Sequence, residues 1–112
     1  MVAAGGGKVA GMAKLMILYG HPQDPAAFED YYFNRHLPFA GQHMPNVTGA
    51  ETVKVVGTAD GSQPPYYRVA EMTYESVAAL HAGLRSEEGQ AVLADLPNFA
   101  TGGVTMLITE SD

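Results

Sequence analysis

The order in which strand-like and helix-like patterns follow one another most constrains the fold of this chain. Four segments rich in apolar, β-branched or aromatic residues are typical of strands, namely 15–19, 50–56, 66–74 and 104–109. Helical patterns over residues 24–36 and 76–95 separate the first strand from the second and the third from the fourth. Because strand–helix–strand crossovers are right-handed, this β-α-β-β-α-β order predicts an α+β fold of ferredoxin-like topology. Its sheet is four-stranded and antiparallel, with both helices on one face.

The first helical pattern has a clear start and a proline near its expected end. Asp24 is a favourable N-cap, and Pro25 suits the first helical position. Because Pro38 disfavours helical backbone at the preceding residue, we expect the helix to end or kink near His36, with an irregular stretch after it. One stripe of this helix contains Phe28, Tyr31, Tyr32, Arg35, His36 and Phe39.

The second helical pattern contains two start signals. Ser76 and Ser86 are both favourable N-caps, and two glutamates occupy the first turn after Ser86. Pro97 follows the expected end near Asp95. We therefore expect two short helical segments between the third and fourth strands.

Apolar residues on both faces of the expected strands predict a second cover for the sheet. In the first strand, Leu15 and Ile17 point to one face while Met16 and Leu18 point to the other. Two helices cover only one face, and a soluble monomer rarely leaves a large contiguous apolar face bare. We therefore expect a homodimer in which the open faces of two copies enclose a dimeric α/β barrel. The alternative is an open face that is only moderately apolar and partly exposed.

Charge and composition exclude several kinds of partner. The 112 residues include 6 Lys+Arg and 12 Asp+Glu, a formal net charge of −6, so we expect neither nucleic acid nor an anionic membrane surface as a partner. The chain has no cysteine, which removes thiolate nucleophiles and cysteine metal sites and fits a cytoplasmic location. No apolar run reaches the roughly 20 residues needed to span a bilayer.

The start of the chain differs in composition from the rest. Residues 1–13 are rich in Gly and Ala and offer no periodic apolar surface, so we expect a disordered tail. Residues 14–112 have the size of a single small domain.

Two motifs give this chain a family resemblance. Residues 28–38, FEDYYFNRHLP, resemble the F-x-x-Y-Y-x-x-x-H-x-P signature of the EthD family, named for ethyl tert-butyl ether degradation. Residues 94–99, ADLPNF, resemble the second signature of that family, A-D-[IL]-P-N-F, and the resemblance extends over about 14–110. It implies a dimeric α/β barrel with relatives among cofactor-free monooxygenases, muconolactone isomerases and haem-handling barrels. It does not imply one settled reaction.

His36 is the main catalytic candidate. The end of a helix favours the protonated imidazole while burial favours the neutral ring, and a group held between these forms suits general acid or base catalysis. The structural alternative is a histidine that caps the helix. Tyr32, one turn before His36, is the second catalytic candidate because its hydroxyl can orient a substrate or the imidazole; the alternative is a core aromatic residue.

Four further residues are candidates for substrate binding. Tyr31 lies beside Tyr32, and Arg68 lies on the third strand as either a solvated residue or a charge at the barrel mouth. Asp95 can orient His36 or bond local backbone, and Asn98 suits a turn. We expect no metal site, because Pro38 breaks the helix that would align His36 with His43.

These residues support three hypotheses about function. The first is an enzyme acting on a small apolar or aromatic compound by cofactor-independent oxidation, isomerisation or dehydration, with His36 as acid or base. The second is a non-catalytic binding or auxiliary protein of an oxygenase system. The third is a haem-binding barrel with His36 as the axial ligand.

Overall fold

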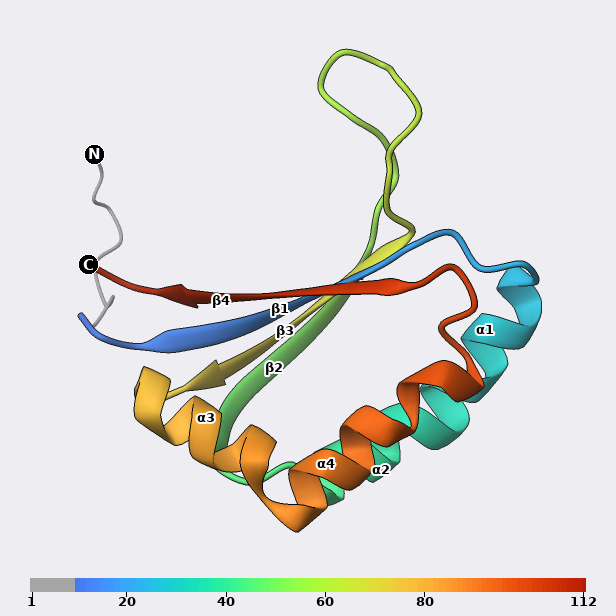
Figure 1. Ribbon diagram of the computed structural model, residues 1–112. Helices are drawn as coiled ribbons and strands as arrows, with labels where there is room; N and C mark the ends of the chain where they lie inside the picture. Colours follow the sequence, from blue (N-terminus) through green and yellow to red (C-terminus); the bar gives the residue numbers. More distant parts are fainter. Residues whose placement is uncertain (1–9) are drawn as a thin grey trace.

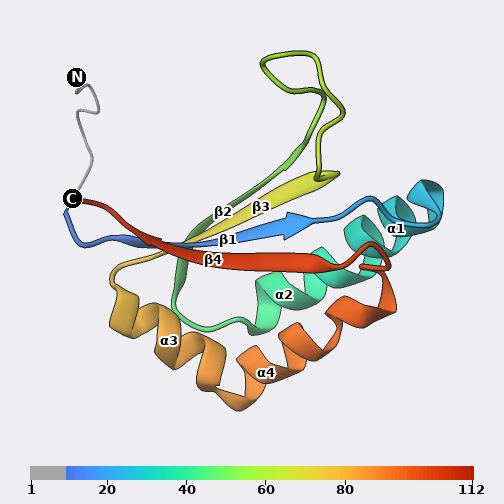
Figure 2. The ribbon, with the colours of Figure 1, turned by 45° about the horizontal axis from the view of Figure 1, so that its top comes forward.

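The computed structural model describes residues 10–112, which form one antiparallel sheet and a layer of helices (Figure 1). The strands, in the spatial order β2-β3-β1-β4, are β1 (Ala13–Tyr19), β2 (Val47–Lys54), β3 (Arg68–Tyr74) and β4 (Val104–Glu110). The helical segments are α1 (Pro25–Tyr31), η2 (Tyr32–His36), α2 (Leu37–His43), α3 (Val77–Arg85), α4 (Glu87–Ala94) and η3 (Leu96–Asn98). The helices lie on one face of the sheet (Figure 2), which confirms the predicted ferredoxin-like α+β fold. Among the helices of residues 10–112, none combines the length and hydropathy that crossing a bilayer requires.

Strand β1 extends further toward the N-terminus than its apolar run indicates. Ala13 is fully buried and pairs with Glu110, and the Ser111 amide donates to the Met12 carbonyl at 2.8 Å. Gly11 in turn donates to the Ser111 carbonyl at 2.9 Å. The last residues of the expected tail, 1–13, therefore join the sheet. Residues 1–9 lie outside the described part of the chain.

The bounds of β2 and β3 differ from the predicted ones. Strand β2 begins and ends before the expected 50–56, and β3 begins at Arg68 rather than at residue 66. Between them, residues 55–67 form a loop that rises from the sheet away from the helices (Figure 1). Three hydrogen bonds from Ser62 and Thr58 to the Asp60 carboxylate order its tip, and the hydrogen bonds from Ser62 lower the pKa of Asp60 to about 2.

The first helix does not end near His36, and the stretch expected to be irregular is helical as far as His43. Segments α1, η2 and α2 follow one another without a break, because the junction residues Tyr32 and Leu37 keep right-handed helical backbone. Segment η2 is π-helical, and the Leu37 amide donates to the Tyr32 carbonyl five residues earlier. The wider π turn accommodates Pro38, which has no amide hydrogen and whose ring collides with a carbonyl in an ordinary α turn.

The π turn also changes which side chains face inward. Phe28, Tyr32 and His36 are buried at a spacing of four residues. After the π turn the inward positions shift by one residue, so that Leu37 follows His36 directly in the lining of the cavity described below. Phe39, expected on the same stripe, instead packs its ring 4.7 Å from the ring of His43.

The hydrophobic core lies between the sheet and the helices. Leu15, Ile17 and Tyr19 of β1 point into it, together with Phe28 and Leu80 from the helices. In the pairing of β1 with β3, Leu15 faces Met72 and Ile17 faces Ala70, so the apolar residues of β3 also belong to the helix-covered face. Strand β1, the most apolar strand, lies between β3 and β4 inside the sheet.

The open face of the sheet is more polar than the sequence indicates. Met16 and Leu18 lie on it, opposite the buried side of β1, and Leu107 of β4 pairs with Met16. It also carries the ion pair between Lys14 and Glu71, with a distance of 3.0 Å. The open face is therefore a mixture of apolar and charged residues.

Candidate functional site

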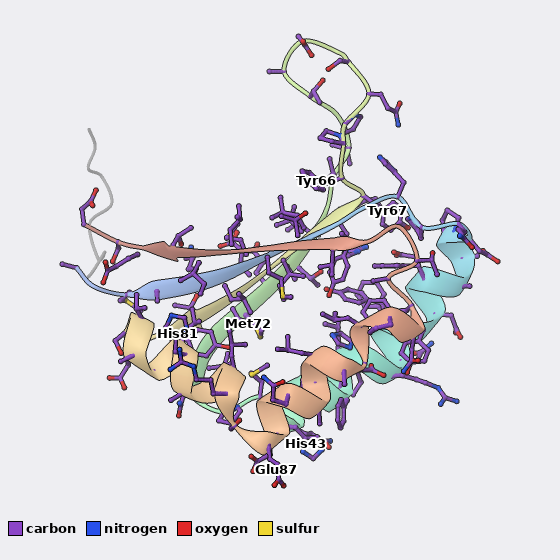
Figure 3. All side chains as sticks on the ribbon, viewed as in Figure 1. His43, Tyr66, Tyr67, Met72, His81 and Glu87 are labelled. Carbon is purple, nitrogen blue, oxygen red and sulfur yellow. The ribbon has the colours of Figure 1, made fainter. Side chains whose placement is uncertain are left out.

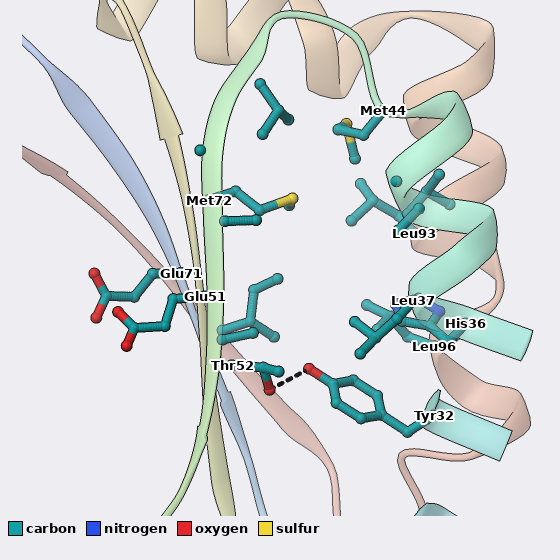
Figure 4. A pocket seen from close by; sticks show the side chains of 18 of the residues that line it. Tyr32, His36, Leu37, Met44, Glu51, Thr52, Glu71, Met72, Leu93 and Leu96 are labelled. Carbon is teal, nitrogen blue, oxygen red and sulfur yellow. Dashed lines mark hydrogen bonds between the residues drawn. The ribbon is translucent and has the colours of Figure 1, made fainter. Parts of the chain in front are cut away.

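A cavity of about 540 Å³ lies between the sheet and the helix layer (Figure 4). Strands β2 and β3 form one wall, and α2 together with the end of α4 forms the other. Glu51 and Glu71 belong to the strands of this wall, but their carboxylates point away from the cavity (Figure 4). The aliphatic lining residues are Ile17, Leu37, Ala40, Met44, Val47, Ala50, Ala70, Met72, Val92, Leu93 and Leu96. An apolar cavity with few polar groups is typical of sites for small organic molecules.

His36 brings a titratable ring into this apolar lining. Its side chain is buried, and its Nδ1 lies 2.9 Å from Oδ2 of Asp95. Because a carboxylate only accepts hydrogen bonds, Nδ1 carries the hydrogen, and Nε2 is an acceptor when the ring is neutral. Within residues 10–112 no protein group bonds Nε2. His36 lines the cavity whereas Asp95 does not, so the carboxylate bonds the ring on the side away from the cavity.

Asp95 is itself held by three side chains. Besides His36, the Tyr31 hydroxyl donates to Oδ1 at 2.6 Å and the Asn98 amide donates to the same oxygen at 2.9 Å. Burial raises the pKa of Asp95, but the hydrogen bonds from Tyr31, His36 and Asn98 outweigh it and hold this pKa below its usual value. The hydrogen bond to Asp95 in turn raises the pKa of Tyr31. Asp95 is therefore a fixed carboxylate.

The second sequence motif, residues 94–99, is what brings this carboxylate to the histidine. Helix α4 ends at Ala94, and Pro97 allows only the short 3-10 turn η3 to follow. This turn places the Phe99 ring 4.5 Å from the His36 ring and stacks it on Tyr31 at 5.5 Å. The two motifs thus form one structural unit, although they are far apart in the sequence.

A pair of hydroxyls lies where the cavity reaches the C-terminal part of β2. The hydroxyls of Tyr32 and Thr52 are 2.8 Å apart, and both residues line the cavity (Figure 4). Nη1 of Arg68 donates to the Thr52 hydroxyl at 3.3 Å, and Nη2 of Arg68 pairs with Glu29 at 3.1 Å. The Arg68 guanidinium lies over the Tyr32 ring at 5.4 Å. Arg68 is thus a buried, paired cation that supports the two hydroxyls.

The sequence-predicted site residues fall into two clusters in the structure. His36, Tyr31, Asp95 and Asn98 form the first, and Tyr32 and Arg68 belong to the second. Asn98 is exposed and bonds Asp95, and Arg68 does not line the cavity, so neither residue is placed to touch a ligand within it. The catalytic and binding roles of these residues stay predictions.

Three residues of these clusters were not identified from the sequence. Glu29 and Thr52 are ordinary surface-type residues in the sequence, and only the fold reveals that they flank a buried arginine. Phe99 was part of the second motif, but its packing against His36 depends on contacts between distant segments. Only the structure shows that Arg68 is buried, and a buried arginine requires a partner carboxylate nearby.

The prediction that Pro38 breaks the helix between His36 and His43 is wrong, because α2 runs through Pro38. The two rings nevertheless lie on different sides: His36 is buried, whereas His43 is exposed at the outer side of the helix layer (Figure 3). In the part of the chain that the structure describes, no three His, Cys, Asp or Glu side chains are grouped so that they can hold a metal ion.

Comparisons with known proteins agree with the two motifs. The model of the EthD domain matches residues 20–103. An uncharacterized 11.0 kDa protein in the thcB-thcC intergenic region of Rhodococcus erythropolis is 41% identical over 101 residues, which cover 90% of this chain and 96% of that protein.

Solved structures extend the comparison to the fold. An ethyl tert-butyl ether degradation (EthD) family protein from Bacillus halodurans has 33% identity and a TM-score of 0.81, covering 90% of this chain and 99% of that one. The hydroxynitrile lyase of Passiflora edulis shares the fold alone, with 12% identity and a TM-score of 0.73 over 93% of this chain and 96% of that one. With a family model that spans most of the chain and a relative at 41% identity, the chain belongs to the EthD family.

Proposed function

We propose that this protein binds a small, largely apolar organic compound in the cavity and acts on it by proton transfer, with His36 as general acid or base. The observation that carries the proposal is the hydrogen bond between His36 Nδ1 and Asp95 in the wall of an apolar cavity. A carboxylate behind the ring fixes its tautomer and stabilises the imidazolium that forms when Nε2 takes a proton. Tyr32, whose ring stacks 6.0 Å from that of His36, orients the bound compound.

A proton-transfer group of this kind serves isomerisation, dehydration and the cofactor-independent oxidation of an activated C–H bond. These are the reaction classes that the sequence predicts for the chain. The alternative, a binding or auxiliary protein, needs the cavity but not the histidine. The two possibilities therefore differ in what a variant of His36 does.

The experiment is a screen of small aromatic and alicyclic compounds by ligand-observed NMR, followed by turnover assays of the compounds that bind. We expect Ala40→Phe, which adds an aromatic ring to the cavity lining, to weaken binding. His36→Asn keeps a hydrogen-bonding amide of similar size, so binding should persist while turnover falls roughly a hundredfold or more. His43→Asn, at an exposed position, is the control. Turnover that His36→Asn leaves unchanged contradicts acid–base catalysis and favours the binding role.

We also propose that the protein forms a homodimer through the open face of its sheet. Support comes from Met16, Leu18 and Leu107 on that face, the last of which is 53% exposed. A protein from Jannaschia that is described as dimeric and ferredoxin-like has the same fold, with 17% identity and a TM-score of 0.66 over 89% of this chain and 99% of that one. The cytoplasmic location stays a prediction from the sequence.

A further inference from the structure

The hydroxyls of Tyr32 and Thr52 together carry one hydrogen more than their hydrogen bonds to the protein use. Tyr32 and Thr52 carry one hydroxyl hydrogen each, and their mutual hydrogen bond uses one of the two. Arg68 is a donor toward Thr52 and takes up neither hydrogen. The Tyr19 hydroxyl also bonds Tyr32: burial and this hydrogen bond raise the pKa of Tyr19, whereas the same hydrogen bond lowers the pKa of Tyr32, so Tyr19 is the donor and takes up neither hydrogen. Whichever hydroxyl donates in the mutual bond, one hydroxyl hydrogen is therefore left for a ligand.

The surroundings of this pair suit an oxygen that gains negative charge. The Arg68 guanidinium polarises Thr52 through its 3.3 Å hydrogen bond, and it is held from behind by Glu29. Burial raises the pKa of Tyr32, although Thr52 and Arg68 act in the opposite direction, so the phenol stays neutral and keeps its hydrogen. The other lining hydroxyl on β2 is already used, because Thr48 donates to the Thr73 carbonyl at 3.1 Å.

We propose that Tyr32 and Thr52 form an oxygen-binding site for the carbonyl group of the substrate, and that the substrate is a ketone with an acidic C–H bond next to that carbonyl. This inference rests on the proposed role of His36. Nε2 of His36 takes the proton from the carbon, the C–H electron pair forms a C=C bond, and the carbonyl π electrons move to the oxygen. The resulting enolate oxygen accepts the spare hydroxyl hydrogen, and return of the proton to the carbon closes the cycle without an oxidant or a cofactor. Arg68 is a positioning residue in this scheme.

The binding half of the inference is tested with two bicyclic probes of the same shape. 2-Naphthol resembles the enol of 2-tetralone, whereas 2-methylnaphthalene replaces its oxygen by a methyl group. We expect the wild-type protein to bind 2-naphthol about tenfold more tightly, the worth of one hydrogen bond. The double variant Tyr32→Phe/Thr52→Val should lose this preference while still binding 2-methylnaphthalene.

Single variants and a control complete the binding test. Because either hydroxyl alone still offers one hydrogen, Tyr32→Phe and Thr52→Val should each keep part of the preference, and Thr52→Ser should keep all of it. Thr48→Val removes a lining hydroxyl that already donates its hydrogen to the Thr73 carbonyl. This variant should therefore keep the full preference for 2-naphthol over 2-methylnaphthalene. Equal affinity of the wild-type protein for the two probes, a measurement that needs no variant, overturns the inference. A preference that survives in the folded double variant overturns it as well.

The catalytic half is tested by deuterium exchange into 2-tetralone in D₂O, followed by proton NMR. We expect the protein to accelerate exchange at the carbon between ring and carbonyl. His36→Asn should abolish the acceleration and keep the preference for 2-naphthol, while the double variant should slow exchange about a hundredfold. If the protein prefers 2-naphthol but His36 does not affect the exchange rate, the proposed proton transfer is contradicted and the oxygen site is not. Exchange that depends on His36 but not on the two hydroxyls contradicts the oxygen site alone.

Discussion

Asp95 is the residue that joins the two sequence motifs into one site. It accepts hydrogen bonds from Tyr31 and His36 of the first motif and from Asn98 of the second. Its side chain is 16% exposed, so these donors replace most of its contact with water. A residue that connects the first helix to the end of the fourth contributes to stability as well as to the orientation of the imidazole.

The lowered pKa of Asp95 predicts a pH-dependent contribution to stability. The carboxylate stabilises the fold above the ordinary aspartate pKa of about 4, and this contribution disappears as the pH falls through the lower pKa of the folded state. We therefore expect Asp95→Asn to lower the free energy of unfolding by about 2 kcal/mol at pH 7, with a difference that shrinks below about pH 4.

Urea denaturation at several pH values measures this difference. Asp30→Asn is a suitable control, because Asp30 is exposed and accepts a single local hydrogen bond from Asn34. A difference between Asp95→Asn and the wild-type protein that stays constant down to pH 2 contradicts the assignment.

The positions of His36 and Asp95 on their elements could be predicted from the sequence, but most of the contacts around them could not. A stripe on a helix and a proline-linked turn are local patterns, so they place Tyr32, His36 and Asp95 on definite elements. The contact between His36 and Asp95 depends on how the helices pack, and the sequence leaves it as one of two alternatives. The burial of Arg68 and its pairing with Glu29 depend on the register of β3 and the position of α1. No local pattern contains that information.

Among the elements, the first helix departs most from its sequence pattern. Pro38 is a reliable sign that an ordinary α-helix ends, and the structure avoids that end by inserting the π turn of η2. Predicted and observed helices agree wherever a cap decides the boundary. The Asp24, Ser76 and Ser86 side chains each accept a hydrogen bond from a backbone amide of the turn that follows. Capping is local chemistry, whereas the π turn is a compromise between Pro38 and the packing on both sides of it.

Where α3 meets α4, the close packing of Gly89 leads us to expect that alanine at this position destabilises the protein. A Cβ on Gly89 falls inside the contact distance of the Gly83 carbonyl oxygen, which is backbone and has little freedom to move. We therefore expect Gly89→Ala to lower the free energy of unfolding by about 1–3 kcal/mol, although alanine usually favours a helix.

The matched comparison for this substitution is Gly41→Ala in α2. A Cβ there meets nothing within 4 Å, so this variant should raise the free energy of unfolding by up to about 1 kcal/mol. Chemical denaturation of both variants measures the two opposite effects. Stabilisation by both substitutions contradicts the close packing of the corner.

At the scale of the whole molecule, the proposed dimer depends on the open face of the sheet. Leu107 is exposed on this face, and Leu107→Asp places a charge where the second copy is expected to pack. We expect sedimentation at micromolar concentration to give the mass of two chains for the wild-type protein and of one chain for the variant.

The control for the dimer is Ala78→Asp. Ala78 is exposed in the first turn of α3, where a negative charge is tolerated, so this variant should stay dimeric. A wild-type protein that sediments as a monomer contradicts the proposed barrel, and the mixed polarity of the open face then explains how a single copy stays in solution.

The strand order also determines when this chain can complete its fold during synthesis. Strand β1 leaves the ribosome before the other strands, yet both of its neighbours, β3 and β4, are made later. One edge of this apolar strand stays unpaired until residues 104–110 have emerged, and an unpaired apolar edge is prone to join another chain. We therefore expect a chain that is cut short before β4 to aggregate rather than to form a smaller working domain.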